Sequence, residues 1–318
     1  MYRLSDIDIR LLNVFTSVVE CRGFTNAQAV LNVGQSTISS HIAELEQRLG
    51  FRLCDRGRSG FRLTHKGERV YALTLKLFKA HEQFQNATME LKGTLSGFLK
   101  VGIIDSTITD PNCPMVRGIE LLNNKASEIS IHLVVLPPNE LQRAILEGNI
   151  DAGVGTFDNH MSELAYKPIY QEYNTLYCAR SHEIARLTAP ADIRAAIVKS
   201  RKVTRSYLEG GDLFPLGEKT DTMHASVEFL EAAAMLLLAG GHIGFLPRHY
   251  ASMWVKSGQL VPVLEDELFY TSDFYVVSRK KPRESTILRT FLADLDHAMN
   301  QIEAGQGIVD SNIGAQPT

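Results

Sequence analysis

The chain of 318 residues is long enough to bury more than one hydrophobic core, and its 44% hydrophobic and 22% charged residues exclude a disordered protein. No apolar run approaches the roughly 20 residues that a membrane span requires, and the N-terminus lacks the apolar core of a signal peptide, so we expect a cytoplasmic protein without a membrane partner. The net charge of −3 hides an asymmetry, because basic residues gather near the N-terminus and the remainder is acidic.

The first informative segment has the pattern of two helices joined by a tight turn. Thr25 and Gln28 form a T-x-x-Q capping pattern, which predicts that the first helix begins at Thr25. Asn32 and Gly34 end it, since both residue types tolerate the backbone angles of a turn. The second helix is expected to start near Gln35. Its apolar stripe consists of Ile38, Ile42, Leu45 and Leu49.

The other face of this second helix carries short, polar, uncharged side chains. A rotation of about 100° per residue places Ser36 and Ser40 opposite the apolar stripe, with Thr37 and Ser39 on its flanks. Ser and Thr exchange hydrogen bonds with base edges, and Gln pairs bidentately with adenine. The pattern therefore suits a helix that reads the major groove, and it equally suits a helical hairpin with a solvated polar face.

A basic segment follows the second helix. Between Arg48 and Lys66 the only acidic residue is Asp55, and Gly57 and Gly60 indicate the tip of a β-hairpin. Such a hairpin, or wing, presents arginines to phosphates. A charge run alone is typical of a solvated face, but this one directly follows a candidate reading helix, which favours DNA contact.

These segments resemble the winged helix-turn-helix of LysR-type transcriptional regulators over about the first 65 residues. The resemblance is carried by LLNVFTSVVE, GFTNAQAVLNVGQSTISSHIAELEQRLG, FRLCDR and RLTHKGE. Gly34 stands where such proteins usually place a capping Ser or Thr, a change that costs only a few tenths of a kcal/mol. The resemblance implies base contacts by Gln35, Ser36, Thr37, Ser39 and Ser40. It implies phosphate contacts by Thr25, Arg48, Arg56, Arg58 and Arg62.

The next segment predicts a long linker helix that pairs with a second copy. Apolar residues recur at alternating spacings of three and four from Val70 to Leu91, a seven-residue repeat kept for three cycles. The expected dimerisation residues are Val70, Leu73, Leu77 and Phe84. The alternative is a helix packed on its own domain. A homodimer or homotetramer would place two reading helices on two half-sites of double-stranded DNA.

After residue 97 strands and helices alternate, which predicts parallel sheet with helices on its faces. We expect strands at 98–104, 129–136, 150–155, 175–179, 201–205, 242–247 and 269–280. We expect helices at 113–126, 140–148, 191–198, 227–239, 248–258 and 285–299. This part is similar to the two-lobed, periplasmic-binding-protein-like effector domain of the LysR type.

The fold class expected is thus an N-terminal α winged helix-turn-helix and an α/β two-lobed effector domain, joined by a linker helix. The expected boundaries are 1–65 for the DNA-binding domain, 66–93 for the linker helix, 94–303 for the effector domain and 304–318 for a flexible tail. Lobe I should comprise about 94–162 and 267–303, and lobe II about 163–266.

The effector is expected in the crevice at the carboxyl ends of the strands. The candidate residues there are Ser106, Thr107, Pro138, Thr156, Thr204, Arg205 and Phe245. Arg205 suits a small organic anion, because a guanidinium holds a carboxylate bidentately. Asp105 and Asp110 make the same wall less hospitable to an anion, and a surface salt bridge is the alternative role for Arg205.

We predict no metal site, no cofactor and no enzymatic activity. His224 and His242 lack a second ligand at metal spacing, and no phosphate-binding or nucleophile-elbow motif is present. The four cysteines are widely spaced and indicate neither zinc nor a disulfide framework. The alternatives are a thiol-based sensor that uses Cys113 and Cys178, and a solute-binding protein, which would leave the basic wing unexplained and would need export.

Overall fold

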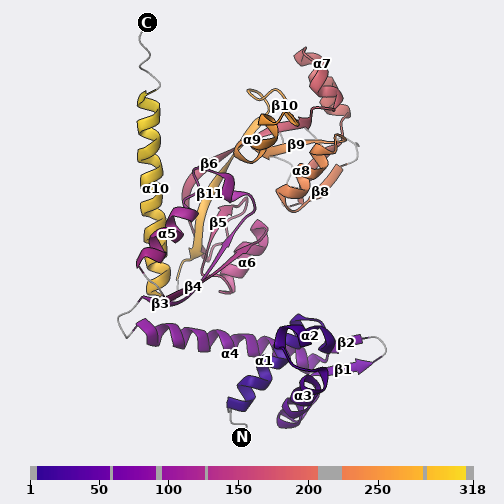
Figure 1. The fold of residues 1–318 in the computed structure, drawn as a ribbon, viewed down its shortest axis with the longest axis vertical. Coiled ribbons are helices and arrows are strands. Elements are labelled where there is room, and N and C mark those ends of the chain that lie inside the picture. Colours follow the sequence, from indigo (N-terminus) through magenta and orange to yellow (C-terminus); the bar gives the residue numbers. More distant parts are fainter. Residues whose placement is uncertain are drawn as a thin grey trace. The chain divides into compact units, whose positions relative to one another are not determined.

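The computed structural model describes residues 6–57, 60–90, 95–125, 128–206, 224–281 and 285–312. The chain divides into two compact units, Met1–Thr88 and Met89–Thr318, whose elements are drawn in Figure 1. Within the described ranges, no helix combines the length and the apolar character needed to cross a bilayer.

The N-terminal unit packs α1 to α3, a short hairpin and the first turns of α4 around one core. Its elements are α1 (Asp6–Glu20), α2 (Phe24–Leu31), α3 (Gln35–Leu49), β1 (Cys54–Gly57), β2 (Gly60–Leu63) and α4 (His65–Glu90). The expected start of α2 is wrong by one residue: its N-cap is Gly23, and no side chain caps it. Thr25 lies inside the first turn, where its carbonyl accepts from Gln28 Nε2 at 3.3 Å.

Helix α3 follows the sequence prediction closely. It begins at Gln35 after the N-cap Gly34, and it ends at Gly50, which adopts the left-handed conformation at φ 78°. Ile38, Ile42 and Leu45 are fully buried in the core, as the spacing predicted. The N-terminal unit therefore holds α3 by its apolar stripe and leaves the polar face toward solvent.

Helix α4 continues directly from the hairpin. Thr64 caps it, because its Oγ1 accepts from the backbone amide of Gly67 at 2.9 Å. With 26 residues the helix is about 39 Å long at 1.5 Å per residue. The first turns pack Val70, Tyr71 and Leu77 against the core of the N-terminal unit.

The C-terminal unit is an α/β structure built on one long sheet. In chain order its elements are β3 (Ser96–Ile103), η1 (Thr107–Thr109), α5 (Met115–Lys125), β4 (Glu128–Val135), α6 (Pro138–Leu146), β5 (Ala152–Thr156), β6 (Leu164–Ala179), η2 (Glu183–Arg186), α7 (Pro190–Lys199), β7 (Lys202–Arg205), β8 (His224–Val227), α8 (Leu230–Leu238), β9 (Ile243–Pro247), α9 (Arg248–Lys256), β10 (Leu260–Pro262), β11 (Phe269–Arg279) and α10 (Thr286–Asn312). The strand order is β4-β3-β5-β11-β6-β9-β7-β8, with β10 also paired to β6.

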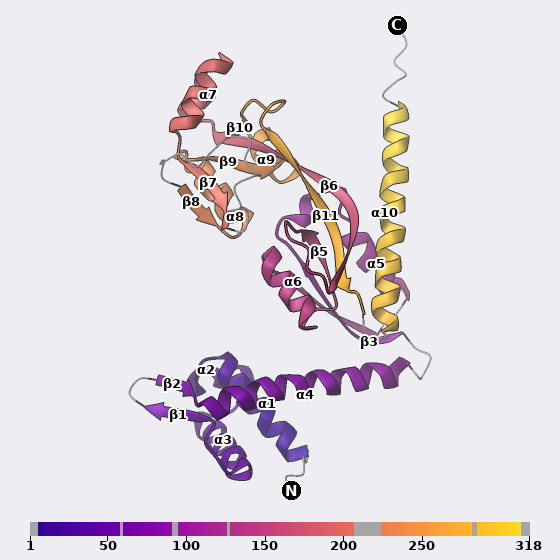
Figure 2. The ribbon, with the colours of Figure 1, turned by 180° about the vertical axis from the view of Figure 1, so that it is seen from behind.

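Two long antiparallel strands, β6 and β11, run through both halves of this sheet, as Figure 2 shows. On one side β11 pairs with β5, which continues into parallel β3 and β4. On the other side β6 pairs with β9, which continues into parallel β7 and β8. We call the first half, with α5, α6 and α10, lobe I, and the second half, with β10 and α7 to α9, lobe II.

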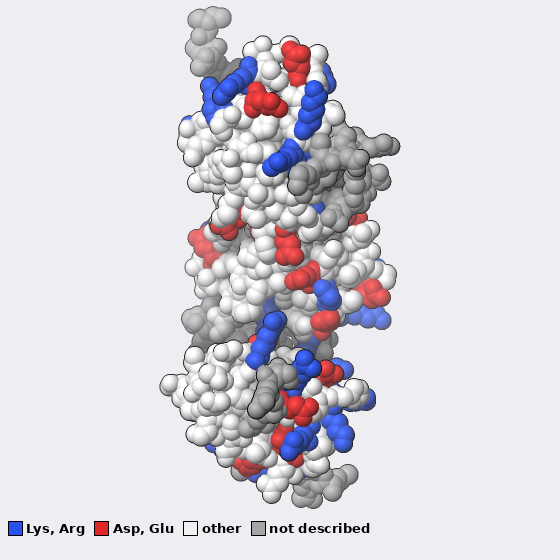
Figure 3. Space-filling model, turned by 90° about the vertical axis from the view of Figure 1, so that its right-hand side faces the viewer, with Lys and Arg blue, Asp and Glu red and all other residues white. Residues whose placement is uncertain are grey.

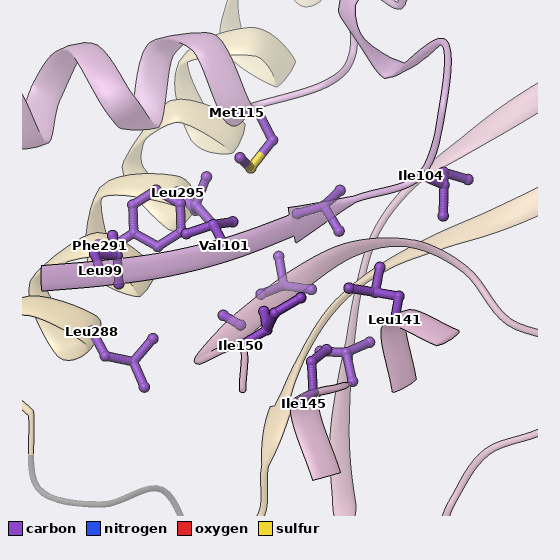
Figure 4. Packing of buried hydrophobic residues seen from close by; sticks show 14 of the residues in the cluster. Leu99, Val101, Ile104, Met115, Leu141, Ile145, Ile150, Leu288, Phe291 and Leu295 are labelled. Carbon is purple, nitrogen blue, oxygen red and sulfur yellow. The ribbon is translucent and has the colours of Figure 1, made fainter. Parts of the chain in front are cut away.

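Each lobe has its own apolar core. In lobe I, β3 packs against α10, and Figure 4 shows Leu99 and Val101 facing Phe291 and Leu295. In lobe II two clusters form, one around Leu237 and Leu246 and one around Leu176 and Ile243. The apolar side chains of each lobe are therefore buried mainly within that lobe.

The sequence prediction missed four features of this unit. Strand β6 begins at Leu164 rather than near residue 175. Strand β8 (His224–Val227) was not expected, and its last residue overlaps the helix that was expected to start at 227. The short β10 was not expected at all. Helix α10 continues to Asn312, through residues that we had assigned to the tail, and residues 313–318 lie outside the described part.

Candidate DNA interface and effector site

The face of α3 opposite its buried stripe is polar and accessible. Gln35, Ser36, Thr37 and Ser40 are exposed, and Ser39 is half-buried. Thr25 is exposed in the first turn of α2. The helix therefore presents the expected uncharged donors and acceptors in one surface, which matches what base edges in the major groove require.

Arg48, at the end of α3, is already engaged within the protein. Its guanidinium forms ion pairs with Asp8 at 3.3 Å and with Glu44 at 2.9 Å. The hydrogen bond to Glu44 and the charge of Asp8 raise the pKa of Arg48. Asp8 is only 1% exposed, so its ion pair with Arg48 links α3 to α1. A phosphate would have to compete with Asp8 and Glu44 for the Arg48 guanidinium.

The wing has the antiparallel register of a hairpin. Asp55 lies opposite Arg62, and Arg56 lies opposite Phe61. Arg62 is exposed on β2. Arg56 belongs to β1, and Arg58 lies outside the described residues. The wing is anchored to α3 because Glu46 Oε1 accepts from the backbone amides of Leu53 at 2.6 Å and Cys54 at 3.2 Å.

The charge of the chain is divided as an N-terminal nucleic-acid interface requires. Met1–Thr88 carries 12 Lys and Arg against 8 Asp and Glu, which gives a net charge of +4. Because the whole chain has a net charge of −3, the remainder has a net charge of −7. Lys and Arg side chains, with acidic ones between them, are visible on the N-terminal unit in the lower part of Figure 3.

The residues predicted for dimerisation on α4 divide into a packed pair and an exposed pair. Val70 and Leu77 pack on the core of the N-terminal unit. Leu73 and Phe84, in contrast, are 56% and 68% exposed, and at about 100° per residue they lie within about 20° of each other on the helix. The helix is thus packed on its own unit along one edge and leaves an apolar edge for another surface.

The predicted effector residues fall into three groups. Ser106, in the left-handed conformation, and the buried Thr107 belong to the loop that follows β3. Pro138 begins α6 and Thr156 ends β5, so both lie at strand ends of lobe I. Thr204 and Arg205 end β7 in lobe II, whereas Phe245 is a core residue of β9, 8% exposed and packed edge-on against Tyr270.

The structure brings the first and third groups together through Asp105, next to Ser106. A carboxylate oxygen of Asp105 accepts from the backbone amide of Leu230, the first residue of α8 in lobe II. Burial raises the pKa of Asp105, while the nearby Arg205 guanidinium and the Leu230 amide act to lower it. The chain's own carboxylate therefore binds the Leu230 amide and lies near the guanidinium that we expected an effector to use.

Comparison with known proteins decides the family. Residues 9–68 match the bacterial regulatory helix-turn-helix protein, lysR family, and residues 92–300 match the LysR substrate binding domain. The chain belongs to the LysR family of transcriptional regulators. Both halves of the resemblance drawn from the sequence are confirmed, including the two-lobed fold of the C-terminal unit.

Individual relatives of this LysR-family chain span nearly its whole length. It is 36% identical over 291 residues to the HTH-type transcriptional activator BauR of Pseudomonas aeruginosa, covering 91% of this chain and 95% of that protein. It is 23% identical to the regulator BenM of Acinetobacter baylyi, covering 96% and 99%. The solved structure of CbnR complexed with its target DNA has the same fold, with a TM-score of 0.62 at 19% identity, covering 91% and 99%.

A further polar cluster lies where the lobes meet, and sequence reasoning did not find it. Asp110 of lobe I, Glu172 of β6 and His249 of α9 place ligand atoms within 4.8 Å of one another. A pocket of about 210 Å³ adjoins them, lined also by Asn112, Gln171 and Arg248. These residues are far apart in sequence, and Glu172 falls in the half of β6 that was not predicted, so no spacing pattern could have joined them.

The cysteines show little sign of thiol chemistry. Cys113 packs against the core of lobe I and Cys178 is buried in that of lobe II, and both are free thiols. Burial raises the pKa of each to about 11. Because the thiolate is the reactive form, neither residue has the lowered pKa of a redox-sensing cysteine.

Proposed function

We propose that this LysR-family regulator binds operator DNA through the polar face of α3 and its wing, acts as a dimer or a pair of dimers, and responds to a small effector held between lobes I and II. The observation that carries the proposal is the exposed row Gln35, Ser36, Thr37 and Ser40, on a helix anchored by a buried stripe, in a unit of net charge +4. Uncharged polar groups read base edges, and positive charge attracts the duplex.

The relatives support this assignment. BauR is named as a transcriptional activator, and CbnR, which shares the fold, has been solved on its target DNA. Dimerisation is supported by the apolar edge of α4 with Leu73 and Phe84, because two α3 helices related by a twofold axis read half-sites about one helical turn apart or at multiples of it.

The test separates base contacts from phosphate contacts. Randomised duplex selection and titrations at several salt concentrations are carried out on the full chain, on Gln35→Ala/Ser36→Ala and on Arg62→Ala. The double variant should lose about 1–3 kcal/mol of discrimination for each good contact removed and keep its salt dependence. Arg62→Ala should keep the preferred sequence and reduce the slope of log K against log salt by about 0.9 per phosphate contact.

Arg201→Ala is the matched control, because Arg201 is an exposed arginine of the C-terminal unit and should change neither quantity. A double variant that selects the same bases as the parent chain would exclude Gln35 and Ser36 from base readout. A parent chain that retains no duplex even at low salt would overturn the assignment to DNA.

The effector proposal follows from the place of Asp105. The Leu230 amide donates to Asp105, and the charge of the nearby Arg205 acts to lower the pKa of Asp105, so two groups that favour an anion act on the same carboxylate. We infer that the effector is a small organic anion that displaces Asp105, and that this displacement changes how the lobes are held. The anion must bind one arrangement more tightly than the other, since equal affinity shifts no equilibrium.

Asp105→Asn tests this inference, because Asn keeps an acceptor for the Leu230 amide and removes the competing charge. Calorimetric titration with a panel of small carboxylates should show tighter binding to Asp105→Asn than to the parent chain, and Arg205→Gln should abolish it. Binding of amines or neutral compounds alone, unaffected by either change, would refute an anionic effector at this place.

A further inference from the structure

The cluster of Asp110, Glu172 and His249 joins three separate elements of the C-terminal unit. His249 Nε2 lies 3.0 Å from Glu172 Oε1 and 3.4 Å from Asp110 Oδ2. The two carboxylate side chains are 2% and 4% exposed, and that of His249 is 12% exposed. Two buried carboxylates thus converge on one ring nitrogen, and buried charges of this kind need a cation.

The other ring nitrogen of His249 is held from outside the cluster. His249 Nδ1 lies 2.8 Å from Thr109 Oγ1, and the same Oγ1 is placed to donate to the carbonyl of Ser106 at 3.0 Å. When Thr109 donates to Ser106, its Oγ1 accepts from a hydrogen on Nδ1. Nε2 then directs its lone pair at the two carboxylates, which is repulsive unless a proton or a metal ion lies between them.

The carboxylates are oriented in the same way. Asp110 Oδ1 accepts from the backbone amide of Asn112 at 2.8 Å, which leaves Oδ2 toward His249. Glu172 Oε2 accepts from Asn174 Nδ2 at 3.2 Å, which leaves Oε1 toward His249. Each of the three side chains thus has one atom held by an outer partner and one atom directed inward, the arrangement by which proteins orient metal ligands.

The two distances to His249 also suit a metal ion. Ligands at about 2.0–2.2 Å from an ion are about 2.9–3.5 Å from one another in octahedral or tetrahedral geometry. Asn174, which holds Glu172, is itself buried, and its Oδ1 has no hydrogen-bond partner in the described part of the chain. Arg248, the cation that also lines the adjoining pocket, is committed to Thr175 Oγ1 and the Glu265 carbonyl.

We propose that Asp110 Oδ2, Glu172 Oε1 and His249 Nε2 bind one divalent transition-metal ion of the Zn²⁺ or Mn²⁺ class. One imidazole and two carboxylates suit such ions better than Ca²⁺ or Mg²⁺, which prefer oxygen ligands only, and the two carboxylates balance the charge of the ion. The remaining coordination positions face the pocket of about 210 Å³. Because Asp110 belongs to lobe I and His249 to lobe II, the ion cross-links the lobes. The proposal does not depend on DNA binding or on an anionic effector.

The test is calorimetric titration of the untagged, chelator-treated full chain with ZnCl₂ and, separately, with MnCl₂. The parent chain should bind one ion that His249→Gln and Glu172→Gln lose. His132→Gln is the matched control, since His132 is exposed on β4 and the same change there should leave this ion in place. Co²⁺ substitution gives an independent readout, because its visible spectrum should change in His249→Gln and not in His132→Gln.

Thr109→Ala keeps the test decisive if the ligand variants do not fold, because Thr109 is exposed and touches only the outer side of the imidazole. Loss of an outer partner weakens metal affinity about 10–100-fold, and Thr109→Ser should restore it. Ion binding that is equal in the parent chain, His249→Gln and Thr109→Ala would overturn the proposal. So would a parent chain that binds no ion, in which case a proton on Nε2 takes the place of the metal.

Discussion

Gly67 offers the sharpest test of how the wing is joined to α4. It lies in the first turn of α4, and a Cβ added there would lie 1.9 Å from the carbonyl oxygen of Leu53. That oxygen also accepts from the backbone amide of Thr64 at 2.9 Å, and Thr64 in turn caps Gly67. Gly67→Ala therefore cannot be accommodated without moving the backbone that connects the wing to α4.

Helix propensity and packing predict opposite signs for this substitution. Propensity alone would make Ala more stable than Gly by at most about 1 kcal/mol. Relief of the clash, in contrast, costs about 1–3 kcal/mol as overpacking, about 1 kcal/mol for the Thr64 cap and about 0.5–1.5 kcal/mol for the hydrogen bond to Leu53. The net expectation is a loss of about 2–5 kcal/mol in the free energy of unfolding of the N-terminal unit.

Differential scanning calorimetry of the full chain measures this effect. For a unit of this size each kcal/mol lowers the melting temperature by about 4–8 °C, so the transition of the N-terminal unit should fall by about 8–40 °C and DNA affinity should fall with it. Gly305→Ala is the control, because Gly305 lies in α10 with nothing within 4 Å of an added Cβ. A Gly67→Ala chain that melts at or above the parent temperature would show that Leu53 and Gly67 do not approach as described.

Two further predictions concern assembly and thiol chemistry. Leu73→Asp should halve the mass found by light scattering without unfolding the N-terminal unit, because Leu73 is 56% exposed. Leu75→Asp is the matched control, because Leu75 is also exposed but lies on the opposite side of α4 at about 100° per residue, and it should leave the mass unchanged. An unchanged mass for Leu73→Asp would remove the apolar edge from the interface. Cys113 and Cys178 should react with iodoacetamide at pH 8 at least about 20-fold more slowly than a free cysteine. A pKa of about 11 lowers the fraction of thiolate at pH 8 by about 200-fold. The greater nucleophilicity of a thiolate with a higher pKa raises the rate by only about tenfold. Mass spectrometry that found either residue modified first would revive the thiol-sensor alternative.

The N-terminal unit could be predicted because its signals are local. The stripe of Ile38, Ile42 and Leu45 depends on helical spacing alone, and all three residues are buried as expected. The cap was the exception: Gly23 rather than Thr25 precedes α2, because the T-x-x-Q pattern describes a possible hydrogen bond and cannot choose between neighbouring start sites. The role of Arg48 was also hidden, since its partner Asp8 lies 40 residues away.

The C-terminal unit was predictable in its strand and helix alternation and unpredictable in its contacts between lobes. The first half of β6 is interrupted by Lys167 and Pro168 and is partly exposed, so it lacks the continuous apolar run that marked the other strands. Phe245 follows the rule for residues near strand ends but is directed into the core of lobe II. Glu172 and His249 meet only because two crossing strands fold lobe II against lobe I, and nothing in either segment indicates the other.

The polar contacts between the lobes converge on one short loop. Asp105 binds the Leu230 amide, and four to five residues later Thr109 and Asp110 contact His249. Hydrogen bonds to charged groups contribute about 1.5–3 kcal/mol each, so breaking one of these contacts would shift the balance between lobe arrangements by about 10–150-fold. A ligand that takes the place of Asp105 moves the loop that also carries Asp110. An anion at Arg205 and a metal ion at His249 are therefore expected to influence each other's affinity by the same factor in both directions.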